Sequence, residues 1–248
     1  MIGNPFACYP YDWTYNVPFL EVFSDGVSTY VYIDDKPCYF PSDMSIEDIE
    51  GYARFFYNIE QDVRSPHRYL TSNFDVSEDD VVVDCGAAEG FFALSVADRV
   101  KKVYVFEPDV RWLEALRKTF APYDNVEIVT KYVSDHTDKY TLSLDDFFYK
   151  KDKPTFIKMD IEGEEERALI GASVLLETSV KKLVTACYHR ANDLYRLSKY
   201  AQRAGFLTST SEGFILTNFD NCEPYARRCL LRGEKLPAED RQKYRPFV

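Results

Sequence analysis

The stretch VVVDCGAAEGFFALSVADRVKKVYVFE, residues 81–107, decides the fold. It begins as a short β-branched run, turns through Gly86 and Gly90, continues with a helical apolar pattern and ends in a second apolar run, 102–107. Short, apolar strands that alternate with helices are typical of a parallel sheet covered on both faces. Ligands of such sheets bind beyond the carboxyl ends of the strands, so we expect functional residues where these runs end.

The same alternation continues along the rest of the chain. Further strands are predicted at 125–133, 154–160 and 180–189, with helices between them. Two more apolar runs, 206–210 and 214–219, flank a turn and are predicted to close the sheet as an antiparallel hairpin. We therefore predict an α/β fold with a seven-stranded, doubly wound sheet that ends in this hairpin.

The N-terminal part is predicted to be a cap, residues 1–75, on a Rossmann-like domain, residues 76–248. The runs FLEVF and VSTYVYI flank Ser-Asp-Gly, which predicts a β-hairpin. A helix is predicted to begin after Ser45, whose side chain would cap it together with Asp48 three residues later. Apolar residues then recur at helical spacing.

Composition narrows the class of protein. The chain has 248 residues, a formal net charge of −11 and 46% hydrophobic residues, which fits a folded globular protein. No apolar run approaches the roughly 20 residues that span a bilayer, and the first residues lack a secretory pattern. A net-acidic chain without a dense Lys/Arg stripe is a poor candidate for binding phosphate backbones, so we expect no nucleic-acid partner. The six cysteines form no CxxC pair, which indicates free thiols and a cytoplasmic location.

The glycine turn indicates which cofactor the sheet binds. Asp84 opens the turn, and Glu107 ends the next strand 23 residues later, near the offset at which an acidic side chain binds ribose hydroxyls. The turn reads D-x-G-x-x-x-G rather than the G-x-G-x-x-G of nicotinamide enzymes, and its acidic residue would repel a pyrophosphate. The same residue would attract a cationic amine. We therefore expect S-adenosylmethionine, and a nicotinamide dinucleotide is disfavoured.

Several segments together resemble the FkbM-type methyltransferases. They are VVVDCGAAEGFFAL, VYVFEPD, YVSD and FIKMDIEGEEERALIGA, within a region of about residues 60–220. The resemblance implies a class I Rossmann-like enzyme that uses S-adenosylmethionine for O-methylation, often of a sugar hydroxyl in a glycan or glycosylated small molecule. By position, it places five turn residues around the methionine part of the cofactor: Asp84, Gly86, Ala87, Glu89 and Gly90. It also assigns Glu107 to the ribose, and Ser134 and Asp135 to the edge of the adenine.

The fourth predicted strand ends in a run of carboxylates. Asp160 and Glu162 come where the strand ends, beside the expected methyl donor, and Asp160 is expected to contact both cofactor and acceptor. Residues 164–166, all glutamates, follow in the first turn of a helix, where negative charge is favourable, and we interpret them as structural. Lys158, on the buried strand, is expected to pair with Asp160 or Asp84.

Methyl transfer to a hydroxyl needs a general base or a divalent metal. His189 ends the fifth strand, which neighbours the fourth in the predicted sheet, and it is the expected base beside Asp160 and Glu162. The same three residues would be the ligands of Mg²⁺ or Mn²⁺ if one bound, although the sequence does not require a metal.

Acceptor contacts are expected from the segment before the first strand, where the cap would fold over the site. His67, Arg68 and Tyr69 are the candidates there, and Arg190, next to His189, is a fourth. The sequence thus predicts an O-methyltransferase with a small-molecule or glycan acceptor, no nucleic-acid partner, no membrane span and possible homodimers. Two alternatives stay open: a methyltransferase for an amine or a protein side chain, and a non-catalytic module that binds S-adenosylmethionine.

Overall fold

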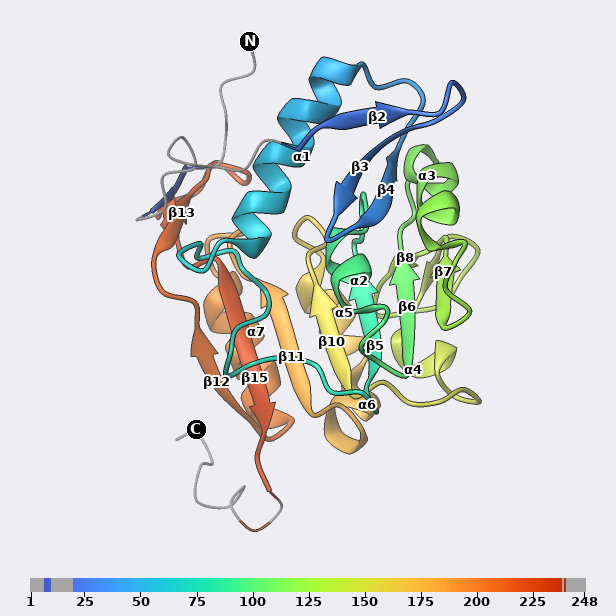
Figure 1. Cartoon of the computed structure of the whole chain (residues 1–248). Coiled ribbons are helices and arrows are strands. Elements are labelled where there is room, and N and C mark those ends of the chain that lie inside the picture. The colour runs from blue at the N-terminus through green and yellow to red at the C-terminus, as the bar shows by residue number, and fades with distance from the viewer. Residues whose placement is uncertain (1–6, 10–19, 238, 240–248) are drawn as a thin grey trace.

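A computed structural model describes residues 7–9, 20–237 and 239 of the chain. At its centre is a seven-stranded sheet in the order β12-β15-β11-β10-β5-β6-β7 (Figure 1). The strands are β5 (Val81–Cys85), β6 (Lys102–Phe106), β7 (Val126–Val129), β10 (Phe156–Met159), β11 (Lys182–Ala186), β12 (Phe206–Thr210) and β15 (Leu230–Lys235). Strands β11, β10, β5, β6 and β7 are parallel, whereas β15 runs antiparallel to both β11 and β12. The predicted fold class is confirmed.

The central strands form because short apolar runs can be buried on both faces. All residues of β5 and β10 are buried. Side chains alternate between the faces, so Val82 joins one hydrophobic cluster while Val81 and Val83 join the other. In chain order, β5 is followed by β6 on one side, and β10 lies on the other. The carboxyl ends of β5 and β10 therefore meet at the switch in strand order, where ligands of such sheets bind.

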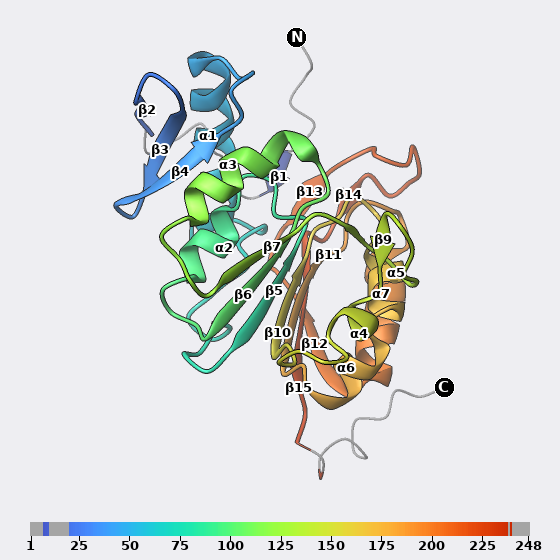
Figure 2. The same ribbon diagram turned by 90° about the vertical axis from the view of Figure 1, so that its right-hand side faces the viewer.

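Helices cover both faces of this sheet (Figure 2). On one side lie α1 (Ile46–Gln61), α2 (Phe91–Val96) and α3 (Val110–Phe120), and on the other lie α4 (Leu144–Phe147), α5 (Glu165–Ile170), α6 (Ser173–Thr178) and α7 (Asp193–Arg203). Among the described helices, none is both long enough and apolar enough to cross a membrane.

The cap consists of α1 and a three-stranded antiparallel sheet, β2 (Val22–Ser24), β3 (Thr29–Ile33) and β4 (Lys36–Phe40). The predicted hairpin and the capping box of Ser45 and Asp48 are both present. The inward side chains Val31 and Phe40 belong to the same hydrophobic cluster as α2 and α3. The cap is therefore packed onto the sheet's helical layer through a shared core.

The predicted antiparallel hairpin of 206–210 and 214–219 does not form the edge of the sheet. β12 pairs with β15, a later strand, rather than with the run at 214–219. The first part of that run is β13 (Phe214–Leu216), which forms a small sheet with β1 (Ala7–Tyr9) and β14 (Ala226–Arg227). The predicted strand 125–133 is also divided, because its last residues form β8 (Tyr132–Val133), which pairs with β9 (Thr141–Leu142).

Candidate active site

A cavity of about 480 Å³ lies at the carboxyl ends of the central strands. We call it the active-site cavity. One wall comes from α1 of the cap, which contributes Tyr52, Phe56 and Glu60, and the opposite wall is the turn 86–89 after β5. A second cavity, of about 310 Å³, shares Gly86, Pro108, Tyr132, Ile161 and Glu162 with the first and extends to Ser134. Together they offer room for a nucleoside cofactor and an acceptor.

The turn after β5 is shaped by a close approach of two backbones. Gly86 has φ +77°, and a Cβ on this residue would lie 1.9 Å from the carbonyl oxygen of Asp160. Its N–H donates a 2.9 Å hydrogen bond to the carbonyl of Phe106. Behind the turn, the Lys158 ammonium lies 2.8 Å from the buried Asp84 carboxylate and donates to the Gly86 carbonyl, also at 2.8 Å. The expected pairing of Lys158 with Asp84 therefore holds this turn in place from within the sheet.

Glu107 lies at the end of β6 with both carboxylate oxygens held by the backbone. Oε2 accepts a hydrogen bond from the Ala88 N–H and Oε1 from the Asp109 N–H, each at 2.8 Å. Burial raises the pKa of Glu107, while these two hydrogen bonds oppose the rise. Each oxygen keeps a second lone pair, and the side chain lines the active-site cavity. A fixed carboxylate that still accepts two donors fits the adjacent hydroxyls of a ribose.

Replacing Glu107 by Gln should weaken the binding of S-adenosylhomocysteine by about 10- to 100-fold, because charge-assisted hydrogen bonds are lost and an amide donor faces the backbone N–H groups. Isothermal titration calorimetry measures this directly. The control is Glu114→Gln on α3, whose carboxylate pairs with Lys118 at the surface. Equal affinity of the Glu107 variant and the wild type would remove the ribose role.

Four side chains converge on the carboxylate of Asp160. Its carboxylate accepts a 2.7 Å hydrogen bond from the Tyr69 hydroxyl and a 3.3 Å one from Tyr188. His67 Nε2 lies 3.3 Å away and His189 Nε2 3.5 Å away. Burial alone would raise the pKa of Asp160, but His67, His189 and Lys158 outweigh it and hold the pKa well below its usual range. Asp160 is therefore an ionised carboxylate throughout the physiological pH range.

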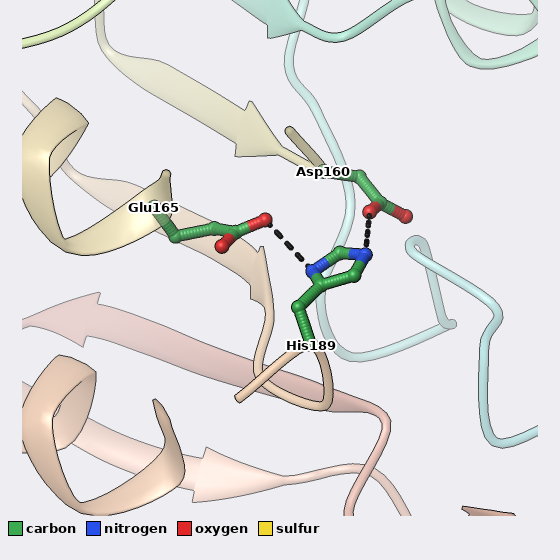
Figure 3. A group of neighbouring side chains, drawn as sticks. All are labelled: Asp160, Glu165 and His189. Atoms are coloured by element: carbon green, nitrogen blue, oxygen red, sulfur yellow. Dashed lines mark ion pairs between the residues drawn. The ribbon is translucent and has the colours of Figure 1, made fainter. Parts of the chain in front are cut away.

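His189 lies between two carboxylates, as Figure 3 shows. Its Nδ1 is 3.0 Å from Glu165, and its Nε2 faces both Asp160 and Glu162 at 3.5 Å. Burial opposes a charge on the imidazole, but these carboxylates prevail and raise the pKa of His189 to about 9. His189 is thus an imidazolium at neutral pH. It cannot accept a proton in that form.

Glu162 occupies the tip of the turn after β10. It has φ +59° and Gly163 has φ +96°, so two consecutive residues adopt the left-handed region that is costly for a non-glycine residue. The Glu162 side chain is 79% exposed, although it lines the active-site cavity. Asp160 and Glu162 approach one ring nitrogen of His189 and Glu165 approaches the other, so the imidazole lies between the carboxylates.

Three residues that the sequence did not single out belong to this site. Glu165 is fully buried against His189, although the sequence grouped it with its exposed neighbours. Its spacing to the apolar Ala168 and Leu169, three and four positions on, is the signal that places it on the inner face of α5. Tyr188 and Glu60 carry no such signal, because only the fold brings them to Asp160 and the cavity.

Other predicted residues lie around or outside the active-site cavity. Gly86, Ala87, Glu89, His67 and Tyr69 line it. Asp84 and Gly90 support the turn but are absent from that lining, and Gly90 is the N-cap of α2. Ser134 lines the second cavity, whereas Asp135 forms a 2.9 Å ion pair with Arg167.

Neither of the two arginines expected to contact the acceptor lines the active-site cavity. The Arg190 guanidinium lies 2.8 Å from the Glu164 carboxylate, and its side chain is half exposed. Arg68 is outside the lining of the active-site cavity, and its carbonyl accepts a hydrogen bond from Arg232. Of the residues expected to contact the acceptor, His67 and Tyr69 line the active-site cavity, and the two arginines do not.

Two more carboxyl groups meet inside the cavity. Glu89 accepts a 2.8 Å hydrogen bond from the Tyr52 hydroxyl, and burial raises its pKa to about 7 despite this bond. Burial, and then the neighbouring Glu89, also raise the pKa of Glu60 well above its usual value. Among the described residues, no hydrogen-bond partner reaches Glu60 Oε2. Both side chains face the space in which a cationic cofactor would bind.

The raised pKa of Glu89 predicts how stability depends on pH. The folded state favours the protonated acid. The contribution of Glu89 to the free energy of unfolding is therefore complete below about pH 4.5 and is lost as pH rises to about 7. Glu89→Gln removes the titration, and its stability relative to the wild type should increase by roughly 3 kcal/mol between pH 4 and pH 8. Urea unfolding of the apoprotein measures the difference, with Glu177→Gln as the exposed control. A pH-independent difference between variant and wild type would contradict the prediction.

Comparisons with known proteins match part of the chain. A model of the ribosomal RNA adenine dimethylase family matches residues 67–159. The ribosomal RNA small subunit methyltransferase A of Staphylococcus haemolyticus is 33% identical over 70 residues, which cover 28% of this chain and 23% of that protein. Its counterpart from Ligilactobacillus salivarius is 42% identical over 55 residues, 22% of this chain and 19% of that one. The chain matches about a fifth of the length of these relatives. The match to the family model stops at Met159, before the acidic turn.

A solved structure resembles more of the chain. The methyltransferase FkbM of Methylobacillus flagellatus is 25% identical, with a TM-score of 0.55, over 67% of this chain and 47% of that one. The chain therefore has the fold of the S-adenosylmethionine-dependent methyltransferases, and its cofactor is S-adenosylmethionine, as the sequence predicted. The cavity and the fixed Glu107 carboxylate fit this group.

One set of expectations is wrong. A small-molecule or glycan acceptor and the absence of a nucleic-acid partner are contradicted, because the matched family and the curated relatives are ribosomal RNA methyltransferases. The expected absence of a nucleic-acid partner relied on the net charge of −11, whereas the expected acceptor came from the resemblance to the FkbM-type methyltransferases. Net charge describes the whole chain and does not decide what a single cavity accepts.

Proposed function

We propose that this S-adenosylmethionine-dependent methyltransferase methylates a hydroxyl oxygen, whose proton passes to Asp160. The observation that carries the proposal is the set of groups around that carboxylate. Tyr69, Tyr188, His67 and His189 all lie within 3.5 Å of it, and the neighbouring positive charges keep it ionised against the effect of burial. A carboxylate that is ionised at neutral pH and oriented within a cavity accepts the proton of a hydroxyl as the methyl group arrives, but its lowered pKa makes it a weak base.

Bound S-adenosylmethionine supplies an electrophilic methyl group on a sulfonium, which the acceptor oxygen takes as its proton leaves. Asp160 accepts that proton, and the imidazolium of His189 offsets the negative charge of Asp160 and Glu162. Tyr69 and Tyr188 hold the carboxylate in one orientation. The step as written needs no divalent metal.

The remaining assignments follow from the lining of the two cavities. We assign the ribose to Glu107, the methionine part to the turn 86–89, and the adenine to the second cavity near Ser134. His67 and Tyr69 are assigned to the acceptor side. Residues 1–75 act as a cap that completes the cavity of residues 76–248. The five described cysteines are free thiols, which supports a reducing compartment such as the cytoplasm.

A second candidate function is N-methylation of adenine in RNA. The match of residues 67–159 to the ribosomal RNA adenine dimethylase family favours it. The sequence after β10 favours oxygen instead. It reads Asp-Ile-Glu-Gly, and it lacks an amide side chain of the kind that would accept hydrogen bonds from an exocyclic amine.

The test follows the position of the transferred methyl group. The protein is incubated with methyl-labelled S-adenosylmethionine and two acceptor pools, purified ribosomal RNA and the nuclease-treated remainder of the same cell extract. Products are digested and analysed by mass spectrometry. A methyl group on an oxygen of the ribosomal RNA supports the proposal, and the nuclease-treated pool is the control for label that does not depend on RNA. Label on the adenine amino nitrogen overturns it in favour of the second candidate, and the absence of transfer to either pool overturns both.

A further inference from the structure

Glu165 differs from the two glutamates beside it. Its side chain is fully buried, whereas Glu164 pairs at the surface with Arg190 and Glu166 with Arg196. One Glu165 oxygen, Oε1, accepts a 2.9 Å hydrogen bond from the Ile161 N–H and lies 3.0 Å from His189 Nδ1. Glu165 therefore joins the turn after β10 to the histidine at the end of β11.

A purely structural role leaves part of this arrangement unexplained. A single hydrogen bond to Ile161 needs only one neutral acceptor, yet a carboxyl group is placed where water does not reach. Among the described residues, Glu165 Oε2 has no hydrogen-bond partner. A buried carboxylate is costly unless a positive charge lies beside it, and His189 is the group at that distance.

We propose that Glu165 is a positioning residue, which fixes His189 with Nδ1 toward α5 and Nε2 toward Asp160 and the active-site cavity. The proposal rests on the function proposed above and adds a residue to it. Figure 3 shows the order of the groups, with the imidazole between Glu165 and Asp160. The 3.0 Å contact between Glu165 and Nδ1 has the distance of an ion pair, and a carboxylate so close to one ring nitrogen favours the orientation in which the other nitrogen faces Asp160.

Other charged groups also face this histidine and enter the design of the test. Asp160 and Glu162 approach Nε2 at 3.5 Å, and Asp193 at the start of α7 interacts with both His189 and Glu165. These groups remain when Glu165 is changed. Glu165→Gln therefore changes only the contact that Glu165 makes with Nδ1 of His189.

The experiment compares Glu165→Gln with Glu166→Gln, the same change one position along the helix at a side chain paired with Arg196. Glutamine keeps an oxygen for the Ile161 N–H and loses the charge. We expect kcat to fall about tenfold or more in Glu165→Gln, with the KM for S-adenosylmethionine changed less than about twofold. The pH at which His189 titrates should fall by about one unit or more. Glu166→Gln should leave all three unchanged.

Nuclear magnetic resonance of the ring nitrogens provides the second readout, and it needs no acceptor. The chain has three histidines, so the His189 signal is assigned by its loss in His189→Gln. In the wild type, Nδ1 should keep its proton and Nε2 should lose one first. An unshifted titration in Glu165→Gln, or Nδ1 deprotonating first in the wild type, would overturn the proposal. If methyl transfer to oxygen fails while these ring signals behave as expected, only the proposed function is lost.

Discussion

Replacing Asp160 by Asn should lower kcat by about 10²- to 10⁴-fold, because the amide cannot take the proton of the acceptor. The affinity for S-adenosylhomocysteine should change far less. The variant should also be less stable than the wild type, since His67 and His189 lose the carboxylate that both approach. Steady-state kinetics and calorimetry on the same preparation separate the two effects.

The matched control for this change is Asp152→Asn, which removes an exposed carboxylate paired with Lys101. It should keep full activity, because surface ion pairs of this kind contribute little. Circular dichroism establishes whether each variant is folded before its rate is interpreted. If folded Asp160→Asn retained the wild-type kcat, Asp160 would not be the base, and His189 would return as the leading candidate.

Gly86→Ala should abolish cofactor binding or prevent folding. The added Cβ would lie 1.9 Å from the Asp160 carbonyl oxygen, and the φ of +77° is itself unfavourable for alanine. Relief of the clash requires the end of β5 to separate from the end of β10, which moves the turn that borders the cavity. Calorimetry with S-adenosylhomocysteine should show affinity reduced by more than about 100-fold, the equivalent of roughly 3 kcal/mol.

Gly51→Ala is the control, because it makes the same chemical change within α1, where no atom lies within 4 Å of the new Cβ. It should raise stability by about 0.5–1 kcal/mol, since alanine is the better helix former. Thermal unfolding measures both variants. Wild-type affinity in Gly86→Ala would show that the two strand ends separate easily and that the close contact does not shape the site.

The strands of the parallel sheet were predictable because their signal is local. Each is a short apolar run between turns, and burial of both faces requires that pattern. The pairing of β12 with β15 was not predictable in the same way. The strand Leu230–Lys235 contains only two strongly apolar residues, and a nearer run at 214–219 matches the pattern better. Which distant segment pairs is decided by the tertiary structure as a whole.

The site residues also differ in whether a local signal in the sequence reveals them. Asp160, Glu107 and His189 follow strands, so the rule that ligands bind at the carboxyl ends of strands located them. Glu165 was missed because three adjacent glutamates were treated alike, although helical spacing distinguishes the inward one. The acceptor was predicted wrongly because its class was taken from a family resemblance and the absence of a nucleic-acid partner from net charge, and neither describes what one cavity accepts.

The position of α1 has a consequence for how the protein assembles. This helix contributes Glu60 and Tyr52 to the cavity and shares its core with α2 and α3, so the cofactor would contact both the N-terminal third of the chain and the strand ends. A ligand that contacts both the cap and the strand ends binds only when the cap is packed on the sheet, so it stabilises that packed state. S-adenosylmethionine would thus join the cap to the sheet as well as donate a methyl group. Deleting the cap would then remove cofactor affinity along with whatever acceptor specificity the cap supplies.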